Sequence, residues 1–350
     1  ADAASDAAPS PLVLFNSLTR RKGPFVPLSA EHVSLYTCGP TVYDSAHVGN
    51  FRAFLTYDVL KRVLRLLGYD VRHYCNLTDV DDKIIARCNR EQESLLSLTR
   101  RFEGKFMADL DALNVVRADG YPRATEHIPE MVRMVQDLEE AGLAYESNGS
   151  WYFRVNKKEG YGQRLVQLDV QKMAPAADED EYDAEKDGAR DFALWKAYKP
   201  GADRDDATWD TPLGRGRPGW HLECSAMART YLGPTIDVHC GGVDLKFPHH
   251  ENEIAQSEGA NDGRPFARYW LHNGFVNVNN EKMSKSTGNF RTLREACPTG
   301  TDVRAYRYLV VSSQYRNPLS FTMEALDAAR AAVRRLDGAR AAVRRAREGH

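Results

Sequence analysis

The sequence predicts an α/β protein built on a parallel sheet, and three observations lead to that prediction. Short apolar segments alternate with amphipathic segments of helical period along the chain, which is typical of parallel strands joined by helices. The chain has 350 residues, of which 42% are hydrophobic, enough to bury the core of one large domain or two. No apolar run approaches the length of a membrane span.

Hydrophobic periodicity predicts the individual elements. The strands expected in the sheet are 33–37, 71–76, 236–239 and 269–272. The expected helices are 51–67, 95–113, 126–141 and 220–231, with two more, 302–312 and 321–347, towards the end of the chain. One further strand, 151–155, is predicted between the two halves of the sheet.

These elements predict five consecutive segments. Residues 1–11, rich in Ala, Ser and Pro, are expected to be a disordered leader or the remnant of a removed targeting segment. Residues 12–110 and 216–290 form the two halves of the sheet domain, with a connective region, 111–215, inserted between them. Residues 291–350 form a helical segment that ends in an arginine-rich amphipathic helix. Either that helix is an ordinary surface helix, with a solvated face and a buried apolar stripe, or it contacts an RNA backbone.

Charge and cysteine content narrow the classes of function. With 27% charged residues the composition is that of a soluble globular enzyme. A net charge of −2 excludes a generally basic surface, so any RNA contact requires a local cluster of Lys and Arg. Six cysteines in a chain of this length do not form a disulfide framework. Reduced thiols in a cytoplasmic compartment are expected, some of them as metal ligands.

A first short motif, His47-Val48-Gly49-Asn50, predicts a phosphate site. It lies between the predicted strand 33–37 and helix 51–67, where free backbone N–H groups and the helix dipole attract anions. His47 can donate to a phosphate oxygen, and Gly49 allows a nucleotide to approach the backbone closely. The alternative interpretation is an ordinary connection between a strand and a helix.

A second motif, Lys282-Met283-Ser284-Lys285-Ser286, predicts a basic loop. Lys282 and Lys285 can neutralise the charge that develops on phosphates as pyrophosphate leaves. The alternative interpretation of this motif, taken alone, is an ordinary polar surface loop. Together with the first motif it indicates that a nucleotide is bound.

A third pattern consists of possible zinc ligands. His249 and Glu253 are four residues apart, so a helix places them on one face. Cys38 ends the first predicted strand, and Cys224 lies in the predicted helix 220–231. Their spacing is not local, and isolated cysteines are usually small core residues. The residues alone therefore leave metal binding and simple burial both open.

The two short motifs resemble the HIGH and KMSKS signatures of class I aminoacyl-tRNA synthetases, and the whole chain resembles the cysteinyl-tRNA synthetases. Besides 47–50 and 282–289, the resemblance rests on residues 36–44, 76–85, 216–227 and 247–258. The sequence departs from the family pattern at Asn50, where the second histidine of HIGH is expected. Cys240 and Val243 are two further departures, in a stretch where the family has small residues.

The resemblance implies a class I Rossmann-type catalytic domain that lacks most of a C-terminal anticodon-binding region. The implied reaction joins L-cysteine to ATP as cysteinyl-adenylate and then passes the cysteinyl group to tRNA(Cys). ATP is expected to bind with Mg²⁺, and one zinc ion per chain is expected on the residues matching the family's ligands: Cys38, Cys224, His249 and Glu253. We expect a cytoplasmic monomer without membrane contact, or an organellar protein if the leader is a targeting remnant.

Roles for neighbouring residues follow from the same match. Gly39 and Thr78 are expected to line the amino-acid pocket, Trp220 and His239 to flank the substrate, and Asp244 to contact ribose or adenine. ATP contacts are expected from His47, Gly49, Asn50, Lys282 and Lys285, with His47 and the two lysines catalytic. His221 is interpreted as a core residue, and the aspartates of the 79–82 stretch as helix caps.

Three alternatives remain at this point. Four protein ligands are typical of a closed structural zinc site, whereas a mixed Cys/Cys/His/Glu set favours substrate binding. A cysteine ligase that uses an amino sugar, as in mycothiol synthesis, shares the zinc and nucleotide motifs but needs no tRNA. A zinc-stabilised paralogue without catalysis is the third alternative.

Overall fold

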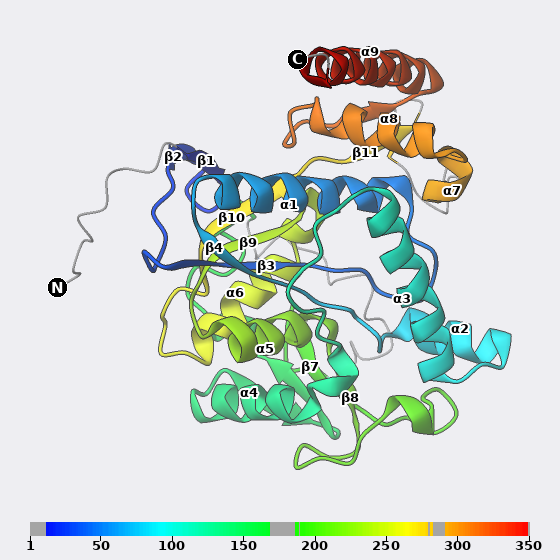
Figure 1. Ribbon diagram of the computed structural model, residues 1–350. Coiled ribbons are helices and arrows are strands. Elements are labelled where there is room, and N and C mark those ends of the chain that lie inside the picture. The colour runs from blue at the N-terminus through cyan, green and yellow to red at the C-terminus, as the bar shows by residue number, and fades with distance from the viewer. Residues whose placement is uncertain (1–11, 169–185, 189, 279–280, 283–290, 349–350) are drawn as a thin grey trace. The chain divides into compact units, whose positions relative to one another are not determined.

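The computed structural model describes residues 12–168, 186–188, 190–278, 281–282 and 291–348 (Figure 1). Their contacts group into two compact units. The first unit comprises Ala1–Asp44, Leu64–Glu103 and Ala118–Leu271, and the second comprises Ser45–Val63, Gly104–Arg117 and His272–His350. The predicted leader, 1–11, lies outside the described residues. The division into five consecutive segments stays a prediction.

The first unit contains most of a four-stranded sheet with the order β10-β9-β3-β4. All four predicted strands are confirmed: β3 (His32–Thr37), β4 (Asp70–Cys75), β9 (Ile236–Gly242) and β10 (Ala267–Asn273). β3 pairs in parallel with β4 and β9, and the register places Thr37 opposite Cys75 on one side and Cys240 on the other. Because parallel strands in register end at one edge of the sheet, the residues that follow them come together there.

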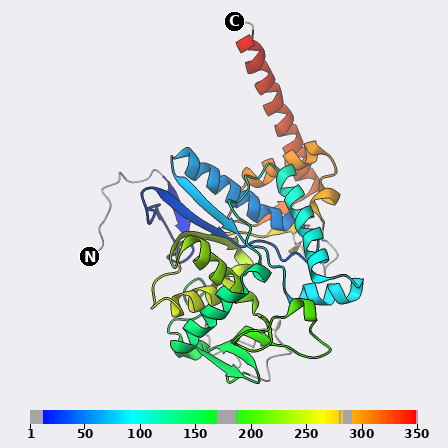
Figure 2. The same cartoon turned by 60° about the horizontal axis from the view of Figure 1, so that its bottom comes forward.

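Three helices of the first unit are layered beside this sheet (Figures 1 and 2). α5 (Trp220–Leu232) packs against β3 and β4, α6 (His249–Gly259) packs against α5, and α4 (Ile128–Glu140) covers α5 from the other side. The predicted helices 126–141 and 220–231 are thereby confirmed. The core of these layers contains large buried side chains, among them Tyr36, Met227, Ile236, Ile254 and Trp270.

A second, antiparallel sheet in the first unit has the order β5-β6-β7-β8. Its strands are β5 (Ala144–Ser147), β6 (Ser150–Phe153), β7 (Phe192–Ala197) and β8 (Gly216–Pro218). β6 confirms the strand predicted near 151–155, although Val155 already begins a 3-10 turn. Asn148 and Gly149 join β5 to β6 with φ angles of 51° and 82°, the conformation that an Asn-Gly hairpin turn requires. This pair is the sequence signal from which the unpredicted hairpin follows.

Smaller elements complete the first unit. β1 and β2 form an antiparallel hairpin, and α2 follows β4 along the chain. Their bounds, with those of the 3-10 turns, are β1 (Val13–Asn16), β2 (Arg21–Pro24), α2 (Asp82–Glu91), η1 (Ala124–Glu126), η2 (Val155–Lys157), η5 (Asp205–Ala207) and η6 (Val243–Lys246).

The second unit combines helices with a small sheet of order β12-β11-β13. α8 packs against α9, while α1 and α3 each lie partly in this unit. The bounds are α1 (Val48–Leu66), α3 (Leu95–Ala112), β11 (Val276–Val278), β12 (Glu281–Lys282), α7 (Leu293–Ala296), α8 (Gly300–Val311), β13 (Leu319–Phe321) and α9 (Met323–Glu348). The four helices predicted here are confirmed, with Phe321 belonging to β13. Among the described residues, no helix has the length and apolar character needed to cross a bilayer.

A buried arginine holds the second unit together. Arg52 of α1 is 1% exposed. Its guanidinium donates to the backbone oxygens of Phe275 (2.6 Å), Gln314 (3.2 Å) and Tyr315 (3.2 Å), and also to that of Asn317. A single cation therefore satisfies four carbonyl oxygens that the chain presents after β10 and after α8.

We predict that Arg52→Met lowers the free energy of unfolding by about 3 kcal/mol, because buried carbonyl groups lose a charged donor. The control is Arg304→Met, which breaks the exposed 2.6 Å pair with Asp337 and should cost less than about 1 kcal/mol. Urea unfolding of both variants measures the difference. Equal losses would show that the carbonyl contacts contribute nothing specific.

Candidate functional site

The predicted metal ligands lie together in the first unit. Cys38 follows β3, Cys224 lies in α5, and His249 and Glu253 lie on the first turns of α6. Their side-chain donor atoms are all within 4.8 Å of one another. All four residues are buried, Cys38 being the most exposed at 7%. Segments separated by about two hundred residues in sequence thus supply one compact donor set.

Glu253 lies at the centre of this cluster. Its Oε1 is 2.7 Å from His249 Nε2, and its Oε2 is 2.5 Å from His239 Nε2. Cys38 Sγ is 3.8 Å from Glu253 Oε1 and 3.3 Å from His250 Nε2. A second donor set, consisting of Cys38, His239, His250 and Glu253, therefore overlaps the first. His239, expected beside the substrate, belongs to this second set, and His250 was not predicted, although the adjacent His249-His250 pair was visible in the sequence.

The cluster is electrostatically suited to a cation. Burial raises the pKa of the Cys38 thiol, while the hydrogen bond from Cys38 lowers the pKa of Cys224 to about 7. Burial opposes ionisation of Glu253, but His239 and His249 hold its pKa well below the ordinary value. The four predicted donors thus supply two sulfurs, one imidazole and an ionised carboxylate. This combination of donor types fits zinc.

Two aromatic neighbours fix the orientation of His249. Burial opposes charging of this imidazole, yet Glu253 and Cys224 raise its pKa to about 10. Trp220 stacks on its ring, with centroids 4.4 Å apart and an interplanar angle of 19°. The Nδ1 atom of His249 lies 3.0 Å from the Nδ1 atom of His221. An outer contact of this kind fixes the tautomer of a metal-binding histidine. His221 is buried, as expected for a core residue, but its contact with His249 was not predicted.

The two residues expected in the amino-acid pocket lie at the same edge of the sheet. Gly39 follows Cys38 directly, and a Cβ there would lie 1.6 Å from the backbone oxygen of Asn76. Only glycine fits at this position, because the chains after β3 and β4 approach closely. Thr78 is 2% exposed and donates its hydroxyl to Glu223 Oε2 at 2.7 Å.

The first nucleotide motif opens helix α1 in the second unit. The backbone N–H of His47 donates to Asn50 Oδ1 (3.0 Å), and the backbone N–H of Asn50 donates to His47 Nδ1 (3.2 Å). This reciprocal pair is the arrangement of a capping box, with His47 preceding the helix and Asn50 at its third position. An accepting Nδ1 leaves the ring proton on Nε2, from which it can be donated to a phosphate oxygen.

The absence of a side chain at Gly49 is explained by its contact with the His47 ring. A Cβ at this residue would lie 2.7 Å from two atoms of the His47 ring. The missing side chain therefore makes room for the imidazole. Asn50, the departure from the family motif, has a structural role as the partner of His47.

The remaining predicted nucleotide residues are only partly described. The backbone of Lys282 belongs to β12, where it pairs with Asn277 of β11. Lys285 and the rest of the motif from 283 onwards lie outside the described residues. Asp244 lies in η6, directly after β9, and is exposed.

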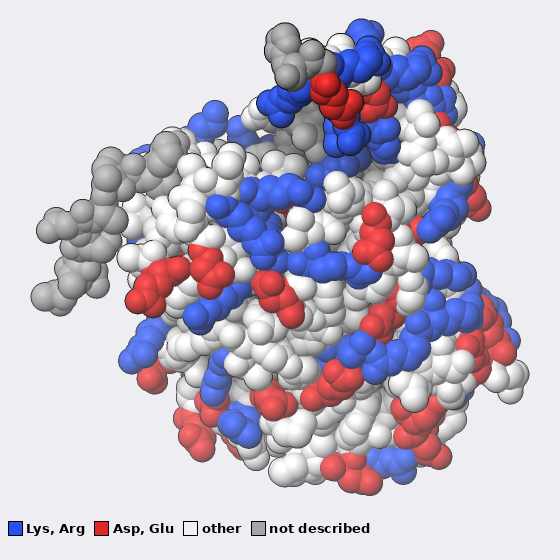
Figure 3. Space-filling model, in the orientation of Figure 1, with Lys and Arg blue, Asp and Glu red and all other residues white. Residues whose placement is uncertain are grey.

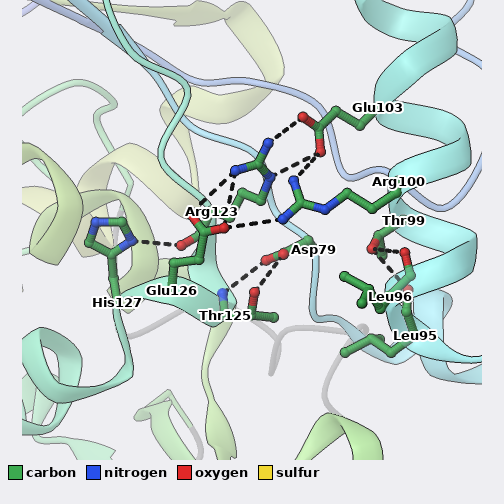
Figure 4. Close-up of polar contacts among 10 residues, drawn as sticks. All are labelled: Asp79, Leu95, Leu96, Thr99, Arg100, Glu103, Arg123, Thr125, Glu126 and His127. Atoms are coloured by element: carbon green, nitrogen blue, oxygen red, sulfur yellow. Dashed lines mark hydrogen bonds and ion pairs between the residues drawn. The ribbon is translucent and has the colours of Figure 1, made fainter.

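The aspartates of the 79–82 stretch have structural partners. Asp79 accepts from the backbone N–H of Thr125 (2.9 Å) and from its hydroxyl (2.7 Å), as Figure 4 shows. Asp81 is the N-cap of α2 and accepts from the N–H of Lys83 at 2.8 Å, which confirms its predicted role. Asp82 pairs with two buried cations of the antiparallel sheet.

The end of α9 is arginine-rich and exposed. Its buried stripe ends at Val333, and every described residue from Arg334 to Glu348 is exposed. In Figure 3 basic side chains lie along this helix, with acidic side chains among them. The expected apolar stripe is therefore confirmed only for the first half of the helix. The exposed arginines of the second half are Arg334, Arg335, Arg340, Arg344, Arg345 and Arg347.

Solved structures with a similar fold are tRNA synthetases. Methionyl-tRNA synthetase of Mycobacterium tuberculosis in complex with methionyl-adenylate has a TM-score of 0.62 and 18% identity, covering 85% of this chain and 68% of that chain. A putative arginyl-tRNA synthetase from Campylobacter jejuni has a TM-score of 0.52 and 15% identity, covering 85% of this chain and 66% of that chain. At such identities these comparisons establish the fold class alone.

Sequence comparison identifies the family. Residues 24–331 match the family described as the tRNA synthetases class I (C) catalytic domain, and the chain belongs to this family. It is 50% identical over 321 residues to a cysteine–tRNA ligase of Thermosynechococcus vestitus, covering 91% of this chain and 66% of the relative. It is 49% identical over 316 residues to a cysteine–tRNA ligase of an Exiguobacterium species, covering 90% of this chain and 66% of the relative. The chain thus spans about two thirds of the length of these relatives.

We predict that Asn50→Ala lowers the free energy of unfolding by about 1 kcal/mol, because the first turn of α1 loses a side-chain acceptor. Asn50→Asp is the matched control, since it keeps the acceptor oxygen and places a negative charge at the helix N-terminus. It should retain the wild-type stability. Urea unfolding measures both variants, and an equal loss in the two would contradict the capping role.

Proposed function

We propose that this chain activates L-cysteine with ATP and transfers the cysteinyl group to tRNA(Cys). The observation that carries the proposal is the buried Cys/Cys/His/Glu cluster at the edge of a class I synthetase sheet. Relatives at about half identity are named cysteine–tRNA ligases, which supports the same reaction. We also propose that the protein acts as a cytoplasmic monomer.

Cys38, Cys224, His249 and Glu253 would hold one zinc ion, which would supply a soft Lewis acid that prefers a thiolate to a hydroxyl group. This preference addresses a chemical difficulty. Cysteine and serine differ only in sulfur against oxygen, and shape alone separates such near-isosteres by roughly a hundredfold. A metal that binds the sulfur atom itself would separate cysteine from serine by more than this factor. We therefore favour a zinc site that binds the substrate over a closed structural zinc site.

In the proposed activation step, a carboxylate oxygen of cysteine attacks the α-phosphorus of ATP. A new P–O bond forms, the bond to the bridging oxygen breaks, and pyrophosphate leaves. The amino-acid carboxylate is already nucleophilic, so positioning and charge stabilisation suffice. We assign these roles to His47, Lys282 and Lys285, acting on ATP with Mg²⁺. Gly49 and Asn50 fix the position of the His47 ring.

Substrate contacts are proposed for residues near the cluster. Gly39 and Thr78 would line the pocket for cysteine, Trp220 and His239 would flank it, and Asp244 would contact the nucleoside. The stacking of Trp220 on His249 supports its place beside the thiol.

In the proposed transfer step, a hydroxyl of the terminal adenosine of tRNA attacks the cysteinyl carbonyl carbon. An ester bond forms, and AMP leaves with the electrons of the broken C–O bond. The exposed arginines at the end of α9 would contact the RNA backbone, since clustered guanidinium groups bind phosphates. The acidic net charge of the chain makes such a local cluster necessary.

Cysteine-dependent ATP–pyrophosphate exchange tests the proposal. We predict exchange with cysteine and a rate with serine that is lower by more than the roughly hundredfold that shape alone supplies. After zinc is removed and its absence verified, cysteine-dependent exchange should fall strongly and return when zinc is restored. Undiminished exchange without zinc would overturn the metal-recognition argument. Exchange followed by transfer to an amino sugar rather than to tRNA would overturn the proposed acceptor.

A further inference from the structure

The helix that carries two of the proposed zinc ligands is polar on every side. All residues of α6 except Gly259 are buried, and among these only Ile254 and Ala255 are apolar. A buried helix is ordinarily held by an apolar surface, and α6 has almost none. Its position therefore depends on hydrogen bonds and ion pairs, which require defined distances and angles.

The face of α6 opposite the two ligands carries two carboxyl groups. Each residue advances about 100° around a helix, so Glu251 and Glu258 lie opposite the face that His249 and Glu253 share. Both carboxyl groups are buried. Buried carboxyl groups need polar partners, and a short segment of the inserted region supplies them.

This segment comprises residues 158–166, directly after η2, and is called the strap below. It consists of turns and bends. Glu251 Oε1 accepts from the backbone N–H groups of Leu165 (2.6 Å) and Val166 (3.1 Å). A carboxyl group keeps an acceptor oxygen in either protonation state, so these bonds do not depend on its charge. The side chain of Leu165 is buried in the same core cluster as the two thiols.

Side chains of the strap hold two more residues of α6. The hydroxyl of Tyr161 donates to Asn252 Oδ1 at 2.5 Å. The guanidinium of Arg164 donates to both oxygens of Glu258, at 3.0 and 3.3 Å, and Lys158 Nζ lies 3.8 Å from Glu258 Oε2. The strap thus contacts the first turn of α6 and also its last turn.

The backbone of the strap directs Tyr161 towards the helix. Tyr161 lies between Gly160 and Gly162, whose φ angles are 73° and 75°, a conformation that glycine adopts readily. The ring of Tyr161 is buried and lies edge-on to that of Phe247, with centroids 6.5 Å apart. Turns on both sides and a packed ring therefore hold the hydroxyl in place before any metal binds.

We infer that the strap positions the zinc ligands of α6, with Tyr161 and Arg164 as positioning residues. The inference rests on the proposed function, because it assumes that the cluster holds zinc. Asn252, the partner of Tyr161, directly precedes Glu253. Metal–ligand distances are fixed to within about 0.2 Å, so a small displacement of α6 weakens metal binding while the fold is kept.

Two substitutions remove strap contacts with little change of shape. Tyr161→Phe deletes only the hydroxyl, and Arg164→Met deletes the charge but keeps a long side chain. In each variant zinc should bind about tenfold more weakly, as when other outer contacts of metal ligands are lost. Competition with a chromophoric chelator measures the zinc affinity of the full chain. Cobalt(II) in place of zinc gives a second measurement, because its absorption spectrum depends on ligand geometry, and this spectrum should change.

Matched substitutions elsewhere separate positioning from stability. Tyr306→Phe deletes a buried hydroxyl that donates to the backbone oxygen of Val48 in the second unit. Arg154→Met breaks the 3.1 Å pair with Asp187, outside the strap. Both controls should keep the cobalt spectrum and a zinc affinity within about twofold of the original, since sites without shared partners act independently. Urea unfolding gives the stability of all four variants.

A double substitution tests the path of the effect. In Asn252→Ala, the further change Tyr161→Phe should leave the zinc affinity unchanged, because both substitutions remove the same hydrogen bond. If Tyr161→Phe weakens zinc binding equally in both backgrounds, the hydroxyl does not act through α6 and the inference is wrong.

The remaining outcomes distinguish the inference from the function beneath it. If the strap variants lose stability but keep the original zinc affinity and cobalt spectrum, the strap has no positioning role. If the controls weaken zinc binding as much as the strap variants do, the inference is also wrong. If the unaltered chain binds no zinc, the metal site of the proposed function itself fails.

Discussion

The buried carboxylate of Glu253 is the constraint on which the site depends. A fully buried charge must be paired, because leaving it alone costs far more than a fold of this size can tolerate. The pairing comes from His249 one helical turn earlier and from His239 on β9. The first helical turns of α6 must therefore lie against the edge where β9 and β3 end. Since the parallel register also brings Cys38 to that edge, one carboxylate fixes the relation between helix, sheet and thiols.

The same edge of the sheet holds two sets of polar groups, namely sulfur donors and a series of hydrogen bonds. The sulfur atoms of Cys38 and Cys224 lie there beside the donor atoms of His249 and Glu253. The hydrogen bonds that reach Thr78 from Gly39 and Asn76 have a single direction, set by a backbone donor. The sulfur donors and these hydrogen bonds thus lie side by side in the segments that directly follow β3 and β4 and in α5. In the second unit, the capping contact between His47 and Asn50 performs a comparable task for an imidazole.

Local patterns in the sequence were sufficient for most of the fold but not for all of the site. The strands of the parallel sheet are short segments rich in β-branched and aromatic residues, and the spacing of His249 and Glu253 already implies one helical face. Cys38 and Cys224 have no such spacing, and only family resemblance joined them. The hydrogen bond between Thr78 and Glu223 could not be predicted in this way, because the two residues are 145 positions apart. Asn50 was interpreted as a departure from a motif, although His-Val-Gly-Asn has the spacing of a capping box.

The central claim is that the thiol cluster holds zinc and binds the substrate through sulfur. X-ray absorption at the zinc edge counts the sulfur atoms bound to the metal and so tests this claim most directly. Without substrate, the account predicts two sulfur ligands, from Cys38 and Cys224. With saturating cysteine it predicts three, and with serine still two. A sulfur count that stays at two when cysteine is bound would contradict the account and make the zinc site purely structural.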